Sequence, residues 1–186
     1  SNGMVARSVD GGNTWKWMQV PGFEKADFRD IEAFDAVTAI IMAIAEPAYI
    51  LKTHDGGITW RKVFVDDRKG MFLDAMEFWN EESGIVTGDP VNGKVFIART
   101  FDGGETWQPL PDENLPVGET GEAMFASSGT NIRAVSLSEA AFVTGGTKAR
   151  FFIRDNKVDL PLMQGQETTG ANSLAVYNSK KRKPAK

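Results

Sequence analysis

Short runs of apolar, β-prone residues alternate along this chain with turns built from Gly, Asn, Asp and Pro. Tyr49 to Lys52 and Val95 to Arg99 are two such runs, and an Asp-Gly-Gly turn follows each of them. The longest apolar run, residues 36–45, is interrupted by Thr38 and has about half the length that a membrane-spanning helix needs. The pattern predicts an all-β protein of short antiparallel strands with no membrane span.

One turn element occurs three times in this pattern. Its copies are Ser8 to Trp15 (SVDGGNTW), Thr53 to Trp60 (THDGGITW) and Thr100 to Trp107 (TFDGGETW). Their aspartates lie 45 and 47 residues apart. That period matches one four-stranded propeller blade, which takes roughly 40–50 residues. The spacing therefore predicts a β-propeller in which each copy joins the two outer strands of a blade.

Each copy has a physical reason to form a tight turn. Glycine accepts a positive φ angle without steric cost, so Asp-Gly-Gly between two β-prone runs predicts a hairpin. The Asp carboxylate can accept backbone N–H groups across the turn, and the Ser or Thr two residues earlier can bond into the same turn. Each tryptophan is expected to anchor sheet packing and to bury roughly 150–250 Å². We assign a structural role to these residues: Asp10, Trp15, Asp55, Trp60, Asp102 and Trp107.

The repeat predicts one partial propeller over residues 1–186, with about four blades of four antiparallel strands. The expected parts are the second half of a blade (1–20), two complete blades (26–65 and 70–110), a blade without an Asp box (121–160) and the start of a further blade (170–186). We expect a fragment of a longer propeller, whose open sheet edges could contact another chain.

The inner strands of the blades can also be aligned. Phe28 to Phe34 (FRDIEAF) resembles Phe72 to Phe78 (FLDAMEF), and Gly121 to Phe125 is a shorter third copy. Asp30 and Asp74 fall at the same blade position, which favours a structural hydrogen-bonding role for both.

The eight-residue element resembles the Asp-box, or BNR, repeat, with the pattern Ser/Thr-x-Asp-x-Gly-x-Thr-Trp. Asp-box propellers include sialidases, xyloglucan-cleaving hydrolases, sortilin-type receptors and photosystem II stability/assembly factor-like proteins. The Asp-Gly-Gly-x-Thr-Trp form and the segment Gly121 to Ser128 look most like the last group, including its members in non-photosynthetic bacteria. The resemblance implies a non-catalytic scaffold that binds protein or carbohydrate ligands in an extracytoplasmic (periplasmic or secreted) location. A shared fold says little about activity.

Two other functions stay open: a secreted glycoside hydrolase of the Asp-box type and a receptor-like ectodomain. Sialidases use a Tyr–Glu pair, an Asp acid and an arginine triad, whereas this chain has only Tyr49 and Tyr177. Xyloglucan-type hydrolases need two carboxylates that face each other across a cleft. Five acidic residues near the inner strands could supply such a pair: Asp30, Glu32, Asp74, Glu77 and Glu122. The sequence favours a protein without catalytic residues, and a glycoside hydrolase if it is an enzyme.

Charge and composition narrow the choice of partners. The net charge is −4, from 21 basic and 25 acidic residues, and five basic residues lie in the tail: Lys180, Lys181, Arg182, Lys183 and Lys186. Residues 1–179 are therefore strongly acidic and would be repelled by phosphate backbones, which argues against a nucleic-acid partner. The absence of cysteine excludes disulfides, thiol nucleophiles and zinc–thiolate sites.

No cofactor and no metal is expected. The box aspartates stand alone in their turns, without the alternating Asp and Asn ligands of a calcium loop. The segment Gly88 to Val95 imitates a phosphate-binding loop, but no Ser or Thr follows Lys94, and we interpret Asn92-Gly93 as a hairpin turn. His54 is the only histidine, and no second type of metal ligand clusters around it in the sequence.

The remaining polar residues of the inner strands are the candidate binding face: Arg29, Glu32, Glu77 and Glu122. The loop from Pro111 to Thr120 holds several acidic residues and is either part of this face or a solvated connection between blades.

Overall fold

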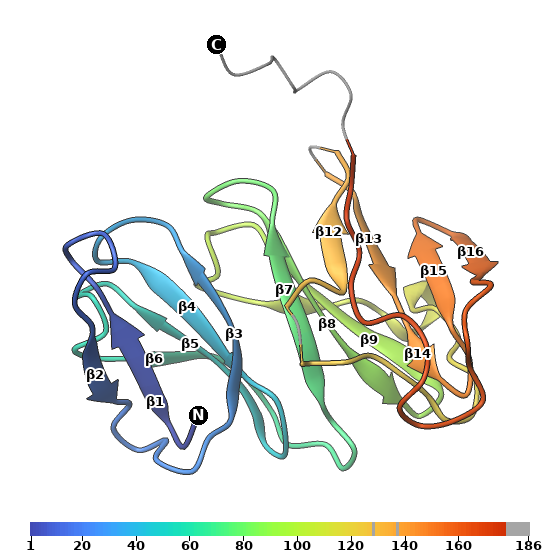
Figure 1. Cartoon of the computed structure of the whole chain (residues 1–186), viewed down its shortest axis with the longest axis horizontal. Coiled ribbons are helices and arrows are strands. Elements are labelled where there is room, and N and C mark those ends of the chain that lie inside the picture. The colour runs from blue at the N-terminus through green and yellow to red at the C-terminus, as the bar shows by residue number, and fades with distance from the viewer. Residues whose placement is uncertain (128, 137, 178–186) are drawn as a thin grey trace.

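The computed structural model describes residues 1–127, 129–136 and 138–177 (Figure 1). Apart from one short 3-10 helix, η1 (Asp112–Asn114), the regular elements in these ranges are β-strands. No helix in them is long and apolar enough to cross a membrane. The basic tail and the end of the segment 170–186 lie outside the described residues. The fold is all-β, as the sequence predicts.

The first part of the chain forms three antiparallel sheets. Strands β1 (Met4–Arg7) and β2 (Lys16–Gln19) form a pair. A four-stranded sheet follows in the order β3 (Phe28–Ala33), β4 (Ala39–Ala43), β5 (Ala48–Thr53) and β6 (Arg61–Asp66). The next has the order β7 (Leu73–Phe78), β8 (Gly84–Val91), β9 (Lys94–Thr100) and β10 (Gln108–Pro109). Strands that lie side by side in chain order are the construction of a propeller blade.

The last four-stranded sheet has an interrupted inner strand. Its strands are β12 (Ile132–Ala134), β13 (Ala140–Val143), β15 (Arg150–Ile153) and β16 (Asn156–Asp159), and β11 (Glu122–Ala123) pairs with β14 (Gly145–Gly146). Ala123 pairs with Gly145 and Ile132 pairs with Phe142, so β11 and β12 are two parts of one inner strand. Residues 124–131 separate them. The predicted third copy, Gly121 to Phe125, therefore supplies only the first pairs of this strand.

Apolar side chains fill the space between successive sheets. The cluster between the β3–β6 and β7–β10 sheets includes Ile40, Ile50, Leu73, Val86 and Phe96. The cluster between the β7–β10 and β12–β16 sheets includes Ile85, Ile97, Phe142 and Phe152. The cluster between the β1–β2 pair and the β3–β6 sheet includes Val5, Val20, Ile41 and Leu51. Successive side chains of a strand point to opposite faces of the sheet. Ile40 therefore packs against the β7–β10 sheet, and Ile41 packs against the β1–β2 pair.

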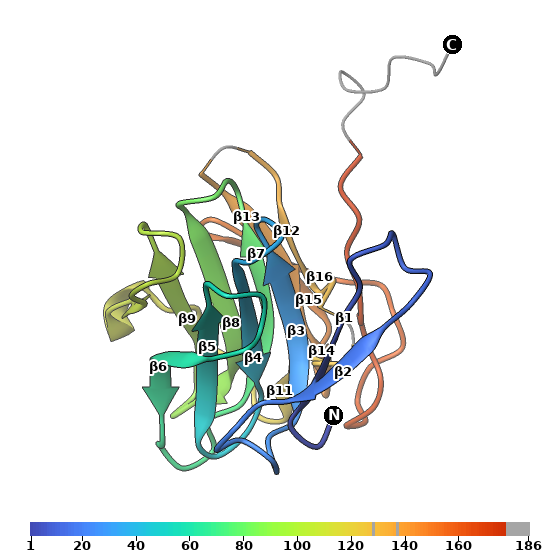
Figure 2. The same cartoon turned by 90° about the vertical axis from the view of Figure 1, so that its left-hand side faces the viewer.

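The sheets form an arc of a propeller. Strand β3 contacts β7, and β7 contacts β12, so the inner strands are neighbours. Figure 1 shows the sheets side by side from β1–β2 to β15–β16, and in Figure 2 the β1–β2 hairpin faces the viewer. Within the described ranges, β1 pairs only with β2. Residues 171–177, in the predicted start of a further blade (170–186), contain no strand, and Gly170 makes a single bridge to Gly145.

Candidate functional site

The three Asp-box turns hold their aspartates in the same way. Oδ1 of Asp10, Asp55 and Asp102 accepts the backbone N–H of the Thr four residues later, at 2.9, 2.9 and 3.0 Å. Oδ2 accepts the hydroxyl of that Thr, at 2.6, 2.6 and 2.5 Å. Both glycines of each turn have positive φ, for instance 73° at Gly56 and 86° at Gly57, where another residue would be strained. Each carboxylate is thus occupied by its own turn.

These hydrogen bonds set the ionisation of the box aspartates. The Thr hydroxyl and then the Thr backbone N–H favour the charged form and lower the pKa of Asp10 and Asp55 to about 2. At Asp102, partial burial raises the pKa, but the same hydrogen bonds outweigh it and bring the pKa to about 2. A carboxylate held in this way is a poor proton donor at neutral pH.

The box tryptophans are buried to different extents. Trp107 is 7% exposed and meets Phe78 edge to face, with ring centroids 5.9 Å apart. Trp60 is half-buried, whereas Trp15 is 58% exposed and Trp17 on β2 is 67% exposed. The expected burial of Trp15 is not found, because no sheet among the described residues covers the outer face of the β1–β2 hairpin.

Asp30 on β3 and Glu77 on β7 connect neighbouring blades. Asp30 Oδ2 accepts the backbone N–H of Met76 at 2.7 Å, and burial raises the pKa of Asp30 to about 6 against the effect of that bond. Glu77 Oε1 accepts the backbone N–H of Ala134 at 3.0 Å, and its Oε2 accepts Arg133 Nη1 at 3.1 Å. Both acids therefore bind the next blade rather than face an open cleft with free oxygens.

The other predicted binding-face residues lie apart from one another. Glu32 is half-buried near Glu77, and burial, followed by the Glu77 charge, raises its pKa. Arg29 is exposed and pairs with Asp27, with 2.7 Å between Nη2 and Oδ2. Glu122 is buried and pairs with Arg150, whose Nε donates to Glu122 Oε1 at 2.9 Å. The four residues do not form one surface, and a binding role for them stays a prediction.

The fully buried Asp74 lies beside the half-buried Asp89. Asp74 is 0% exposed, and neither of its carboxylate oxygens has a hydrogen-bond partner among the described residues. The backbone N–H groups of Ala126 and Asp89 favour its charged form, although Asp89 N–H donates its hydrogen bond to the Phe72 carbonyl oxygen, at 2.9 Å. Burial and then the Asp89 charge raise the pKa of Asp74 well above its ordinary value. Burial also raises the pKa of Asp89 to about 6, although Met124 N–H donates to its Oδ1 at 2.7 Å.

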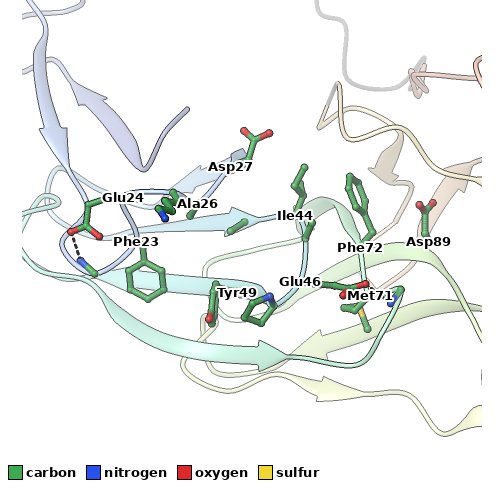
Figure 3. Close-up of a pocket in the computed structure, with 16 residues that line it drawn as sticks. Phe23, Glu24, Ala26, Asp27, Ile44, Glu46, Tyr49, Met71, Phe72 and Asp89 are labelled. Carbon is green, nitrogen blue, oxygen red and sulfur yellow. Dashed lines mark hydrogen bonds between the residues drawn. The ribbon is translucent and has the colours of Figure 1, made fainter.

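A cleft of about 920 Å³ opens beside this pair. It is lined by residues 22–27 between β2 and β3, residues 43–47 and 49 around the β4–β5 hairpin, residues 70–72 before β7, and Asp89 (Figure 3). Strand β5 runs from this hairpin to the second Asp-box turn, so the cleft and the turn lie at opposite ends of β5. The volume falls within the range of ligand-binding sites in proteins.

The floor of the cleft is apolar. Phe23 and Tyr49 meet edge to face, with ring centroids 5.1 Å apart. Ile44 and Met71 are buried at 8% and 1% exposure, and Phe72 is half-buried. These side chains come from three different segments, and their packing against the cores of two blades fixes the shape of the cleft.

Acidic groups lie along the cleft. Its lining has four carboxylates, Glu24, Asp27, Glu46 and Asp89, and one basic side chain, Lys25. Figure 3 shows Glu24 near one end and Asp89 near the other. Glu24 Oε1 accepts Gly22 N–H at 2.8 Å and Glu46 Oε1 accepts Gly70 N–H at 2.6 Å, so both carboxylates are held in place by the backbone.

Three further sequence candidates have other roles. Asn92 and Gly93 have φ angles of 53° and 75° and form the turn between β8 and β9, as predicted. His54 Nε2 lies 2.8 Å from Glu105 Oε1 in an exposed ion-pair network. The loop 111–120 packs along β9, where Val117 bridges Lys94. In the part of the chain that the structure describes, no three His, Cys, Asp or Glu side chains gather as a metal site would require.

The lining of the cleft is not singled out by any sequence pattern. Its residues come from four segments of the chain, and no motif joins them. One signal was present: Phe23 and Met71 are large apolar residues in connections between blades, where loop residues are usually polar.

Comparison with known proteins agrees with this fold. Residues 98–109, which contain the third turn element, match the BNR/Asp-box repeat family. No curated protein matches the chain. A solved structure of YCF48 bound to D1 peptide is similar, with a TM-score of 0.51 and 21% sequence identity over 86% of this chain. The chain spans less than half of that protein, 44% of its length. The fold is therefore that of a partial Asp-box propeller similar to YCF48.

Proposed function

We propose that this chain is a non-catalytic propeller scaffold that binds an extended segment of a partner protein in the cleft. The cleft itself carries the proposal, because a concave apolar floor with a few fixed polar groups is the usual form of a binding site. The likeness to YCF48, which was solved with a bound D1 peptide, supports a role in holding protein segments. From the sequence resemblance alone, we also propose an extracytoplasmic location.

The positions of the acids support a scaffold over a glycoside hydrolase. Glycosidases need two carboxyl groups on opposite sides of the scissile bond, one to donate a proton and one to act as base or nucleophile. Asp30 and Glu77 accept backbone N–H groups of the next blade, and the box aspartates are bound within their turns. Asp30 and Glu77 are thus engaged in holding blades together, and the box aspartates in closing their own turns.

A bulky side chain placed in the cleft should block binding. Ala45 is exposed and lines the cleft, so Ala45→Trp adds an indole without replacing a core side chain. Ala36 is exposed in the β3–β4 connection at the other end of the sheet, and Ala36→Trp is the matched control. A random library of short peptides displayed on phage is panned against the wild-type chain, and affinities of the enriched peptides are measured by fluorescence anisotropy. We expect Ala45→Trp to weaken binding about tenfold or more, which is about 1.4 kcal/mol.

The control variant should bind as the wild type does. Equal binding of the enriched peptides to Ala45→Trp and to the wild type would place their site elsewhere and contradict the proposal. A panning that enriches no peptide, while a glycan array captures the chain, would favour a carbohydrate ligand instead.

A further inference from the structure

We infer that the segment held in the cleft carries a lysine or arginine two residues from a bulky apolar residue. The inference rests on the proposed function and adds the chemistry of the partner. Its basis is the combination of a strongly acidic lining with an apolar floor in one cleft.

The charge of the lining favours a cation. Four carboxylates face one ammonium group, that of Lys25, and Arg29 outside the cleft neutralises only Asp27. Glu24, Glu46 and Asp89 form no ion pair within the described residues. A positively charged partner group is attracted to such a lining, and an acidic one is repelled.

Glu24, Glu46 and Asp89 each have an oxygen that can accept a further hydrogen bond. Glu46 uses Oε1 for Gly70 N–H and Asp89 uses Oδ1 for Met124 N–H, while Oε2 and Oδ2 accept no bond from a described residue. Behind Asp89, the fully buried Asp74 has no hydrogen-bond partner among those residues. A guanidinium or ammonium group bound beside Asp89 would donate to Oδ2 of Asp89 and bring a positive charge near Asp74.

The apolar floor lies next to these acids. Figure 3 shows Glu46 between Tyr49 and Met71, and Asp89 beyond Phe72. In an extended segment, residues i and i+2 point to the same side. A basic residue at Glu46 or Asp89 would therefore place the residue two positions away over Tyr49, Met71 or Phe72. The large Leu, Ile, Met and aromatic side chains bury the most apolar surface there.

Amide variants remove the charge and keep the local hydrogen bonds. In Glu46→Gln and Asp89→Asn, the amide oxygen can still accept Gly70 N–H and Met124 N–H. The matched control is Asp35→Asn, in the β3–β4 turn away from the cleft, where Oδ1 accepts the N–H groups of Val37 and Thr38. Thermal unfolding of each variant checks that the fold is kept.

The same phage library tests the inference. We expect the enriched peptides to carry Lys or Arg two residues from a bulky apolar residue. The double variant Glu46→Gln/Asp89→Asn should bind them about tenfold or more weakly, and Asp35→Asn should bind them as the wild type does. Citrulline in place of the peptide arginine should weaken binding to the wild type and have little further effect on the double variant, which is the signature of a direct pair.

The outcomes separate this inference from the proposed function. Enriched peptides that are blocked by Ala45→Trp but show no preference for a basic residue would contradict the inference and leave the proposed function standing. A loss of affinity that is equal in Asp35→Asn and in the double variant would indicate general attraction to an acidic surface and would also contradict the inference. Peptides that bind Ala45→Trp normally would contradict both.

Discussion

Glu122 and Arg150 illustrate what buried charges do at the scale of single residues. Their side chains are 0% and 2% exposed. Glu122 Oε1 accepts Arg150 Nε at 2.9 Å and the Thr144 hydroxyl at 2.5 Å, and Arg150 Nη2 donates to the Val117 carbonyl oxygen at 2.8 Å. The hydrogen bonds that Arg150 donates to Glu122 raise the pKa of Arg150. This pair joins β11 to β15 and to the loop before β11.

Removal of Glu122 should therefore be costly. Glu122→Ala leaves the Arg150 charge buried without its partner, and we expect a loss of about 3–5 kcal/mol in the free energy of unfolding. Urea denaturation followed by circular dichroism measures it. Glu119→Ala is the control, since Glu119 Oε1 lies 4.0 Å from Arg150 and its side chain is 59% exposed. A similar, small effect in both variants would contradict the structural role of Glu122.

The Asp-box carboxylates should show a different dependence on pH. The folded-state pKa of Asp55 is about 2, below its unfolded value of about 4. Its contribution to stability is thus present above pH 4 and is lost as the pH falls through 2. Asp55→Ala should lower the melting temperature at pH 7, and the difference from wild type should shrink between pH 4 and pH 2. Asp67→Ala, at an exposed loop position, should do neither; an unchanged melting temperature for Asp55→Ala would count against the turn role.

At the scale of elements, the same kind of hydrogen bond, from a backbone N–H of one blade to an aspartate of its neighbour, joins blades at two junctions. Asp30 accepts a backbone N–H of β7, and Asp89 accepts the Met124 N–H that follows β11. Each carboxylate is largely buried between two blades, and its pKa rises to about 6 because of that burial. The bond orders the junction, and the charge carries a desolvation cost.

The variant Asp89→Asn separates the effect of the hydrogen bond on stability from the effect of the negative charge. Because the folded pKa of Asp89 is raised, its charged form costs stability above about pH 6, and the cost disappears as the pH falls toward 4. The variant keeps the acceptor for Met124 N–H and carries no charge that burial disfavours. We expect it to gain about 1–2 kcal/mol over the wild type at pH 7.5 and about a third of that at pH 4.5. Urea midpoints of both proteins at both pH values measure this difference. A stability gain of Asp89→Asn over wild type that is smaller at pH 7.5 than at pH 4.5 would contradict the prediction.

The sequence predicts elements well where turn chemistry is local. Glycines at positive φ and the spacing of Asp10, Asp55 and Asp102 predict hairpins that the structure contains. The sequence predicts strands less well where their pairing depends on residues that are distant in the chain. The division of one inner strand into β11 and β12 follows from the insertion 124–131, which has no period to reveal it.

At the scale of the whole molecule, the repeat predicts a partial propeller, and the sheets form one. The candidate site was harder to predict. Glu122 has the appearance of a polar inner-strand residue, but its partner Arg150 is brought to it only by the fold. The cleft arises where connections between three sheets meet, so its residues share a location and no sequence pattern.

We predict that the protein does not hydrolyse sialosides or xyloglucan. Asp30 and Glu77 hold neighbouring blades, and the sequence shows no Tyr–Glu pair and arginine triad like those of sialidases. Release of 4-methylumbelliferone from a sialoside and of reducing ends from xyloglucan measures activity. Turnover above that of a heat-denatured sample, abolished by Glu77→Gln or by Glu32→Gln, would contradict this prediction.

The uneven burial of the tryptophans gives the chain a built-in optical probe. Trp15 and Trp17 stand in water on the β1–β2 hairpin, whereas Trp107 is buried. Indole emission moves to shorter wavelength when water leaves its surroundings, and iodide quenches only accessible rings. The lining of the cleft contains no tryptophan. A blue shift with protection from iodide would therefore report a partner on the hairpin, while a ligand confined to the cleft would leave the emission of Trp15 and Trp17 unchanged.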